Sequence, residues 1–593
     1  MTRAEASVLG AATAIAWAAT VSLVLAAAGV HQAAPYVSLL GLAAFAPVVR
    51  AERDRASALL VLGAVALGAF LYVPAYAYGS SDRDPGVYAA TTYAIERTGS
   101  FSVDDPLAGQ DVLVDGQRLP GLHPAGERVL PGFFLTEPSF AATTGRRVAG
   151  PLAAIVAVAA FGLVLRRLAG TTAGVLTVLL VAGTMPQVWQ AKVPGPEMLA
   201  QVGVAGALLA ATTGAYARAG ALTTFVWLAR PDGVLAFLLG LALGRRRRPY
   251  LAGLLAAAPV ALWQTYVLAD DYAARNGLPP WPVLLAVAAL AITAGPPVLR
   301  ALRRHAFALA LVFVAALLVR QALAPDPPAL VAYRAVKGYE PYTLSRIAGL
   351  VTWPGVVLAL LGVRHAARRA PLLLAPVLLA APYLVHPRVS PDLMFWGRRF
   401  VPLLLPGIAM LAAYAVSRRK VLAVLAVVAV VVPYTQSLPL RGHDEYGGGL
   451  AAARAAAEVS EPGAVYVWVR RKEPCCDQAA YLFPGLVWLR HGRPGFTVLP
   501  EQAQARASAV EGPVYVVADG TEPPFEGLVA VTRYTATLRA WERGGLDPPD
   551  AARDVPVDFT VWRYAAMAAA TSSALRATRQ ATTTLPPPST RSR

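Results

Sequence analysis

The chain has 593 residues, of which 56% are hydrophobic and only 15% are charged. Soluble domains carry about 25% charged residues, so this composition excludes an ordinary soluble protein and favours one surrounded by lipid. The formal net charge is +18, but the basic residues gather in short connectors between apolar stretches. That distribution is typical of the cytoplasmic connectors of a membrane protein and argues against nucleic acid as a partner.

Apolar stretches of membrane-spanning length follow one another through the first three quarters of the chain. Because about 20 apolar residues cross the hydrocarbon core, we predict a polytopic α-helical membrane protein with about 13 spans in a transmembrane domain of residues 1–435. The spans are 8–30, 34–49, 57–78, 149–165, 171–187, 197–216, 250–268, 282–299, 306–323, 349–363, 371–385, 400–416 and 421–434. The basic connectors, residues 300–304 among them, share one side if the N-terminus is cytoplasmic, which predicts a multi-pass plasma-membrane protein.

The apolar stretch 219–243 departs from this alternation, because basic residues stand at both of its ends. Pro231 and Gly233 interrupt it, so we predict a re-entrant hairpin of two half-helices. Arg230 and Asp232 lie at its tip, where an unpaired charge is costly. We therefore expect these two side chains to pair with each other, and either to hold the hairpin together or to contact a substrate.

The first large outer loop covers residues 79–148 and brings two carboxylates close to the end of the third span. Asp82 and Asp84 lie at the water–lipid boundary, from which a carboxylate reaches both a soluble acceptor and a lipid headgroup. As a general base, Asp84 can take a proton from an acceptor hydroxyl. The alternative is that the same stretch caps a helix over 85–97, with a proline at its first position.

Further polar residues stand at the outer ends of other segments. Lys192 and Glu197 lie in the second outer loop, and Arg398 and Arg399 lie at the outer mouth of a late span, against the positive-inside rule. Guanidinium groups bind phosphate oxygens in a bidentate way, so the two arginines either hold a lipid phosphate or pair with acids of the first loop. The remaining candidates are Tyr88, His123 and Arg346.

The composition changes after the last span. Residues 464–469 and 514–519 alternate as strands do, and the alanine-rich run 450–457 is typical of a helix. We therefore predict an extracytoplasmic α/β domain over residues 436–563, which places the C-terminus outside. The tail 570–593 is rich in Thr, Pro, Ser and Arg and is expected to be disordered.

Sequence signatures of known cofactor and metal sites are missing from the chain. Phosphate-binding loops, zinc motifs, dinucleotide-binding motifs and the nucleophile elbow are all absent, so we predict no cofactor. The only two cysteines, Cys475 and Cys476, are neighbours. Disulfide geometry disfavours a bridge between neighbours, so we expect no chemistry from them.

Several of these segments, in this order, resemble the bacterial GT-C fold glycosyltransferases, which include lipid A aminoarabinose transferases, protein mannosyltransferases and actinobacterial arabinosyltransferases. The matching segments are Asp84-Pro85-Gly86-Val87-Tyr88-Ala89, Ile95-Glu96-Arg97-Thr98-Gly99-Ser100, Pro194-Gly195-Pro196-Glu197, Leu228-Ala229-Arg230-Pro231-Asp232-Gly233 and Trp396-Gly397-Arg398-Arg399-Phe400. The likeness is spread over residues 57–434. It implies a GT-C-like fold and a transferase that works on the outer face of the membrane.

The resemblance also implies a mechanism and partners. A sugar would move from a polyprenyl-phosphate donor to an extracytoplasmic glycan, lipid or protein acceptor, with inversion at the anomeric carbon. Asp84 would be the base, Asp82 a second acid, and Arg398 or Arg399 would hold the donor phosphate, with Arg346 at the same mouth. Pro85 stands where many relatives have Glu, which leaves the use of a metal open.

Two alternatives come from other classes of protein. One is a polytopic transporter or lipid flippase, and the other is a membrane scaffold that displays the C-terminal domain. Transporters tend to carry internal repeats and polar residues near the membrane midplane. Here no repeat is evident, and the polar residues gather in the outer loops.

Overall fold

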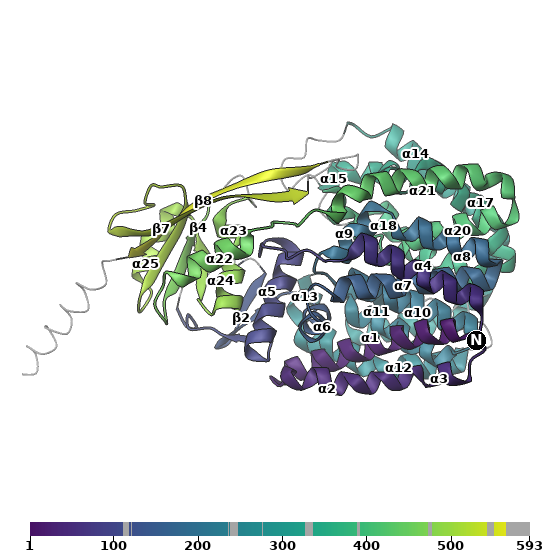
Figure 1. The fold of residues 1–593 in the computed structure, drawn as a ribbon, viewed down its shortest axis with the longest axis horizontal. Coiled ribbons are helices and arrows are strands. Elements are labelled where there is room, and N and C mark those ends of the chain that lie inside the picture. The colour runs from purple at the N-terminus through teal and green to yellow at the C-terminus, as the bar shows by residue number, and fades with distance from the viewer. Residues whose placement is uncertain are drawn as a thin grey trace, which may run out of the picture.

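The computed structural model describes residues 1–110, 118–119, 121–234, 236–237, 247–275, 277–326, 336–387, 392–471, 477–541 and 551–564. The chain forms a bundle of helices and, beyond one end of the bundle, a domain built on a sheet (Figure 1). The N-terminus lies at the opposite end of the bundle from the sheet domain. Cys475, Cys476 and the predicted tail 570–593 lie outside the described residues.

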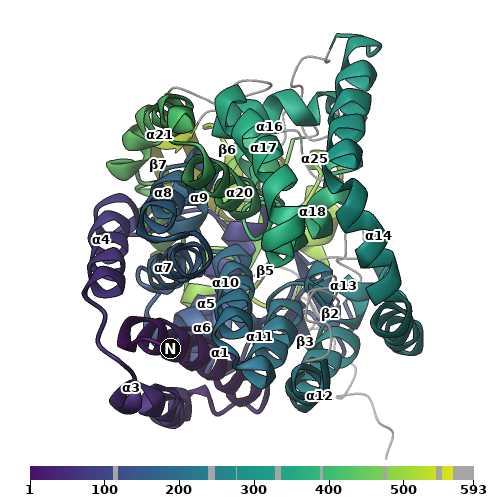
Figure 2. The same ribbon diagram turned by 90° about the vertical axis from the view of Figure 1, so that its right-hand side faces the viewer.

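The helices of the bundle and outer loop alternate with short connectors. They are α1 (Arg3–Ala27), α2 (Ala34–Ser38), α3 (Ala46–Arg50), α4 (Arg55–Tyr72), α5 (Arg83–Thr98), α6 (Thr136–Thr144), α7 (Ala149–Ala169), α8 (Thr171–Ala182), α9 (Met185–Lys192), α10 (Glu197–Thr213), α11 (Tyr216–Ala229), α12 (Arg247–Trp263), α13 (Asp270–Arg275), α14 (Trp281–Ala322), α15 (Val336–Tyr339), α16 (Thr343–Val351), α17 (Trp353–Arg369), α18 (Ala375–Val385), α19 (Leu393–Gly397), α20 (Leu404–Arg418) and α21 (Ala423–Ser437). Figure 2 views many of them end-on, with α4 and α14 on opposite sides of the bundle.

Among the described residues, seven helices are long and apolar enough to cross a membrane. The number rises to nine if two bent pairs each count as one span: α8 with α9, bent by 66°, and the segment Glu340–Val351 with α17, bent by 100°. Three shorter apolar helices add Glu197–Thr213, Pro371–Val385 and Leu404–Arg418. The fold is therefore that of a polytopic helical membrane protein, and the figure of about 13 spans stays a prediction.

Helix α14 differs from the prediction. It runs unbroken over 42 residues, where spans 282–299 and 306–323 were expected to be separate. The intervening residues 300–304 are Arg, Ala and Leu, which are strong helix formers, and no glycine or asparagine follows Pro297 to end the helix. At 1.5 Å per residue the helix is about 63 Å long, twice the hydrocarbon thickness. The predicted break between the two segments is therefore wrong, while Arg303–Ala322 alone is long and apolar enough to cross a membrane.

The predicted re-entrant segment is only partly described. Helix α11 ends at Ala229, and a short turn follows in which the Gly233 N–H donates to the Arg230 carbonyl at 2.9 Å. The break at Pro231 is thus where the sequence predicted it. Most of the return half falls on residue 235 and residues 238–246, which lie outside the described part of the chain.

The first outer loop contains α5, a small sheet and α6. The sheet has the order β1–β3–β2 and is formed by Val103–Asp104, Arg128–Pro131 and Leu122–Ala125. Helix α5 begins at Arg83 rather than at residue 85, with Asp82 at its N-cap position. Asp84 therefore lies inside the first turn, which corrects the expectation that it caps the helix. Arg83 itself has a φ of +60°, a strained value for a residue with a side chain.

The sheet domain carries five strands in the order β5–β4–β6–β8–β7. Their bounds are β4 (Val465–Val469), β5 (Gly495–Val498), β6 (Val514–Asp519), β7 (Leu528–Trp541) and β8 (Ala552–Tyr564), and its helices are α22 (Gly449–Glu458), α23 (Ala479–Leu482), α24 (Pro484–His491) and α25 (Pro500–Ser508). The predicted strands and helix correspond to β4, β6 and α22. The long antiparallel pair β7–β8 was not singled out in the sequence, and it reaches from the sheet domain towards the bundle (Figure 1).

Two glycines allow α11 and α12 to pack closely. A Cβ atom on Gly220 would lie 1.9 Å from the carbonyl oxygen of Tyr250, and one on Gly253 would lie 1.8 Å from that of Ala217. Backbones that approach so closely need small residues, as is common between membrane helices. Any side chain at these positions forces the helices apart.

We therefore expect Gly220→Ala to destabilise the protein by about 2 kcal/mol, the usual cost of overpacking. The measurement is thermal unfolding of the purified protein in detergent. Gly63→Ala in α4 is the matched control, because a Cβ there meets nothing within 4 Å. Equal melting temperatures for the two variants would contradict the close packing of α11 on α12.

Candidate functional site

An ion pair joins the start of α5 to the residue that follows α19. The Arg398 Nη1 atom lies 2.5 Å from the Asp84 Oδ2 atom. The Asp84 side chain is 25% exposed and that of Arg398 is 12% exposed, so the pair is partly open to solvent. The structure thus brings together two residues that the sequence singled out for different roles, a base and a phosphate holder.

A second ion pair lies beside the first with its charges reversed. Arg83 Nη1 lies 2.7 Å from Asp392 Oδ2, across 309 residues of chain. Asp392 precedes α19 and Arg398 follows it, so two adjacent residues of α5 contact both ends of this short helix. Because the two pairs have opposite polarity, α19 can lie against α5 in one direction only. We call these contacts the crossed ion pairs.

The Phe395 ring contacts the arginine of each crossed ion pair. The Arg83 Cζ atom is 4.7 Å from the ring centroid and the Arg398 Cζ atom is 4.8 Å from it. Both guanidinium groups therefore gain a cation–π contact with the same ring, which offsets part of the cost of holding two cations in a partly dry environment. Arg346 adds to this region from α16, with its Cζ atom 4.2 Å from the centroid of the Trp396 ring.

A chain of alternating charges lies next to the crossed ion pairs. Arg230 Nη1 is 2.5 Å from Glu197 Oε1, and the same guanidinium binds both carboxylate oxygens of Asp232 at 2.9 Å. Tyr383 donates to Asp232 at 2.6 Å, and Arg399 Nη1 is 3.6 Å from it. The predicted pairing of Arg230 with Asp232 is confirmed. Removing charges from water is tolerated here because each has a partner.

The other predicted site residues lie in varied surroundings. Tyr88 is one turn beyond Asp84 on α5, with its ring 5.6 Å from that of Phe133. Lys192 donates to the Arg441 carbonyl at 2.9 Å and lies over Tyr76, so it does not pair with Glu197. Asp82 has its Oδ2 atom 3.9 Å from Arg83. His123 lies on β2, opposite Leu130.

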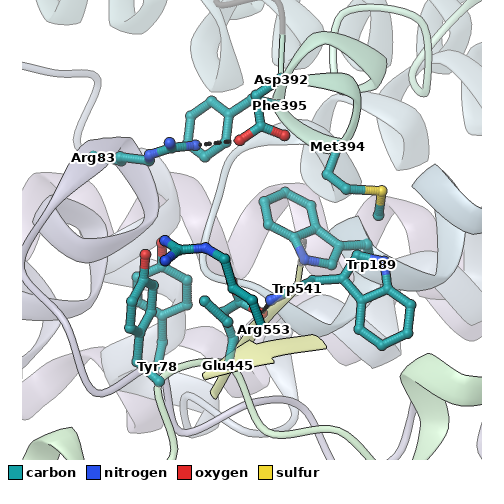
Figure 3. A pocket seen from close by; sticks show the side chains of 11 residues that line it. Tyr78, Arg83, Trp189, Asp392, Met394, Phe395, Glu445, Trp541 and Arg553 are labelled. Carbon is teal, nitrogen blue, oxygen red and sulfur yellow. Dashed lines mark hydrogen bonds and ion pairs between the residues drawn. The ribbon is translucent and has the colours of Figure 1, made fainter. Parts of the chain in front are cut away.

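Part of the sheet domain also reaches the crossed ion pairs. A cavity of about 20 Å³, room for one water molecule, has Arg83 and Asp392 on one wall and Trp541 and Arg553 of the β7–β8 pair on another (Figure 3). The backbone N–H of Trp541 donates to the Glu445 Oε2 atom at 3.0 Å, which ties the strand to the chain leaving the bundle. The sheet domain therefore covers the Arg83–Asp392 side of the site.

Sequence reasoning missed several residues of this region, above all Arg83, Asp392 and Glu137. Glu137 is buried on α6, and its Oε2 atom has no hydrogen-bond partner among the described residues. Burial raises the pKa of Glu137 to about 8; a backbone hydrogen bond from Gly195 opposes the rise, and the charge of Glu197 adds to it. Among the described residues no group of three or more His, Cys, Asp or Glu side chains is placed to hold a metal ion.

No family model and no curated protein matches the sequence. Among solved structures, the chain is similar to the oligosaccharyltransferase of Archaeoglobus fulgidus in its apo form, with 13% identity, a TM-score of 0.46 and coverage of 78% of this chain and 69% of that one. It is similar to the arabinofuranosyltransferase AftD from Mycobacteria, with 14% identity, a TM-score of 0.43 and coverage of 86% and 40%. ArnT from Cupriavidus metallidurans gives 13% identity, a TM-score of 0.34 and coverage of 86% and 98%.

These neighbours are of the GT-C kind that the sequence resembles. Their identities to this chain are low and their TM-scores lie below 0.5.

The buried carboxyl of Glu137 predicts how stability depends on pH. Its pKa rises from an ordinary 4.5 to about 8 on folding, so the folded state holds a proton that the unfolded state releases. Its contribution to stability is complete below pH 4.5 and is lost as the pH rises towards 8. We expect the melting temperature to fall between pH 5 and pH 8, and to fall less steeply in Glu137→Gln, whose amide stays neutral. Parallel curves for the two proteins would contradict this assignment.

Proposed function

We propose that the protein is a membrane glycosyltransferase that moves a sugar from a polyprenyl-phosphate donor to a hydroxyl group of an extracytoplasmic acceptor. The observation that supports the proposal is the contact between Asp84 and Arg398, because a carboxylate suited to act as a base lies beside a guanidinium suited to bind an anion, in a partly exposed position. The end of the bundle next to the sheet domain would face the outside, and the N-terminus the cytoplasm.

In the proposed step, Asp84 accepts the proton of the acceptor hydroxyl as its oxygen attacks the anomeric carbon. The bond between that carbon and the phosphate oxygen breaks, and the phosphate leaves with the electron pair. Arg398 and Arg399 stabilise the negative charge that develops on it. Attack from the face opposite the leaving phosphate inverts the configuration of the anomeric carbon.

Arg399 suits the role of a second phosphate contact because Asp232 does not depend on it. Two hydrogen bonds from Arg230 and one from Tyr383 already satisfy the Asp232 carboxylate, and the Arg399 contact is the longest of the set. Arg230 holds Asp232 and Glu197 in place and has no charge left for a ligand. This supports a positioning role for Arg230 and a binding role for Arg399.

The proposal predicts that Asp84→Asn lowers sugar transfer by about 10²- to 10⁴-fold, the range that a general base contributes, while the donor still binds. Transfer is measured as release of polyprenyl phosphate by the purified protein. The matched control is Asp104→Asn, in the same loop, whose side chain is 94% exposed and which should keep full turnover. If Asp84→Asn transfers sugar at the control rate, Asp84 is not the base; a transporter or scaffold would also be indifferent to the change.

A further inference from the structure

The contact that supports the proposed function also conflicts with it. In an inverting displacement the base and the leaving phosphate stand on opposite faces of the sugar, with the anomeric carbon between them. With its Nη1 atom 2.5 Å from Asp84, Arg398 would hold that phosphate beside the base instead of across the sugar from it. Asp84 in turn has its negative charge neutralised by the arginine. The pair has to open before the reaction can begin.

We propose that the donor phosphate and Asp84 compete for Arg398, so that binding of the donor releases the base. This inference rests on the proposed function and adds an order to it: the donor binds first, and the acceptor hydroxyl meets an active base only afterwards. Without donor, Asp84 stays paired, and water is not activated next to the site.

The two crossed ion pairs differ in their exposure to solvent, and the exchange of partners requires such a difference. The side chains of Arg83 and Asp392 are 9% and 7% exposed, and the sheet domain covers them. Those of Arg398 and Asp84 are 12% and 25% exposed. Water and an incoming anion therefore reach the Asp84–Arg398 pair more easily. The Arg83–Asp392 pair remains closed and keeps α19 against α5 while the other pair opens.

Arg398 also has contacts that remain when the donor phosphate replaces Asp84. The Phe395 ring stays 4.8 Å from its guanidinium, so the charge remains beside the ring after Asp84 leaves. The Nε atoms of Arg398 and Arg399 are buried and have no hydrogen-bond partner among the described residues. Two adjacent guanidinium groups with unused donors are suited to a phosphate, which offers several acceptor oxygens.

Binding of a phosphate without a sugar tests the competition directly. The probe is farnesyl phosphate, and its affinity is measured for the full-length protein in detergent. Asp84→Asn removes the competitor, so it should bind the probe about fivefold more tightly than the natural protein, the size expected for a partly exposed ion pair. Arg398→Gln should bind it at least tenfold more weakly, because the anion holder is lost.

Asp104→Asn separates competition from a general change of charge. Asp104 lies in the same outer loop and carries the same charge, but its side chain is 94% exposed and its nearest basic partner is Arg128, at 3.6 Å. Its removal should change the affinity less than twofold. Equal tightening in Asp104→Asn and Asp84→Asn, or no tightening in Asp84→Asn, would overturn the proposal. If Asp84→Asn does not fold, Asp84→Ser removes the same charge with a smaller side chain and has to meet the same expectation.

The outcomes of the binding experiment distinguish failure of the competition from failure of the proposed function. If Asp84→Asn tightens phosphate binding but the natural protein consumes no polyprenyl-phosphate sugar, the competition stands and the transferase proposal falls. If the natural protein consumes such a sugar and Asp84→Asn binds the phosphate no more tightly, the transferase stands and the competition falls.

Discussion

Two ion pairs of opposite polarity hold the start of α5 against both ends of α19, and the candidate site is built around them. Arg83 and Asp84 are adjacent in the chain, yet they meet Asp392 and Arg398 at opposite ends of α19, and both arginines lie over the Phe395 ring. Charges in a mostly buried place are costly unless each has a partner. Here a shift of α19 by one residue would break both pairs at once, so the electrostatics fix where the helix lies.

The second network reaches the same segment from the other side. Glu197, Arg230 and Asp232 form a buried chain at the break after α11, and Arg399 stands at its end. Arg398 and Arg399 thus belong to different networks although they are neighbours. Arg398 is paired with Asp84, the proposed base. Arg399 contacts Asp232, whose carboxylate already has hydrogen bonds from other groups. Once Asp84 is released, two adjacent guanidinium groups can bind one phosphate, and the Glu197–Arg230–Asp232 chain stays intact.

Sequence position alone identified part of this site. Asp84 stands just after a span, and Arg398 and Arg399 break the positive-inside rule. These positions indicate all three as candidate site residues. The sequence leaves open whether a lipid phosphate or an acid of the first loop is the partner of Arg398, and the structure pairs Arg398 with Asp84. Arg83 lies between two acids in the sequence, and nothing local indicates that it pairs with Asp392 instead. Glu137 resembles an ordinary acid in the first turn of a helix, and only the fold buries it.

Periodicity also has limits at the level of the fold. It located most apolar helices, but it divided α14 at arginines that continue a helix well, and it overlooked β7–β8, which lies next to the site.

The proposed function is tested most directly by incubating the purified protein with a panel of polyprenyl-phosphate sugars and an acceptor hydroxyl. It predicts that one donor is consumed, with free polyprenyl phosphate released and the transferred sugar inverted at its anomeric carbon. Every donor remaining intact, or transfer with retained configuration, would contradict it.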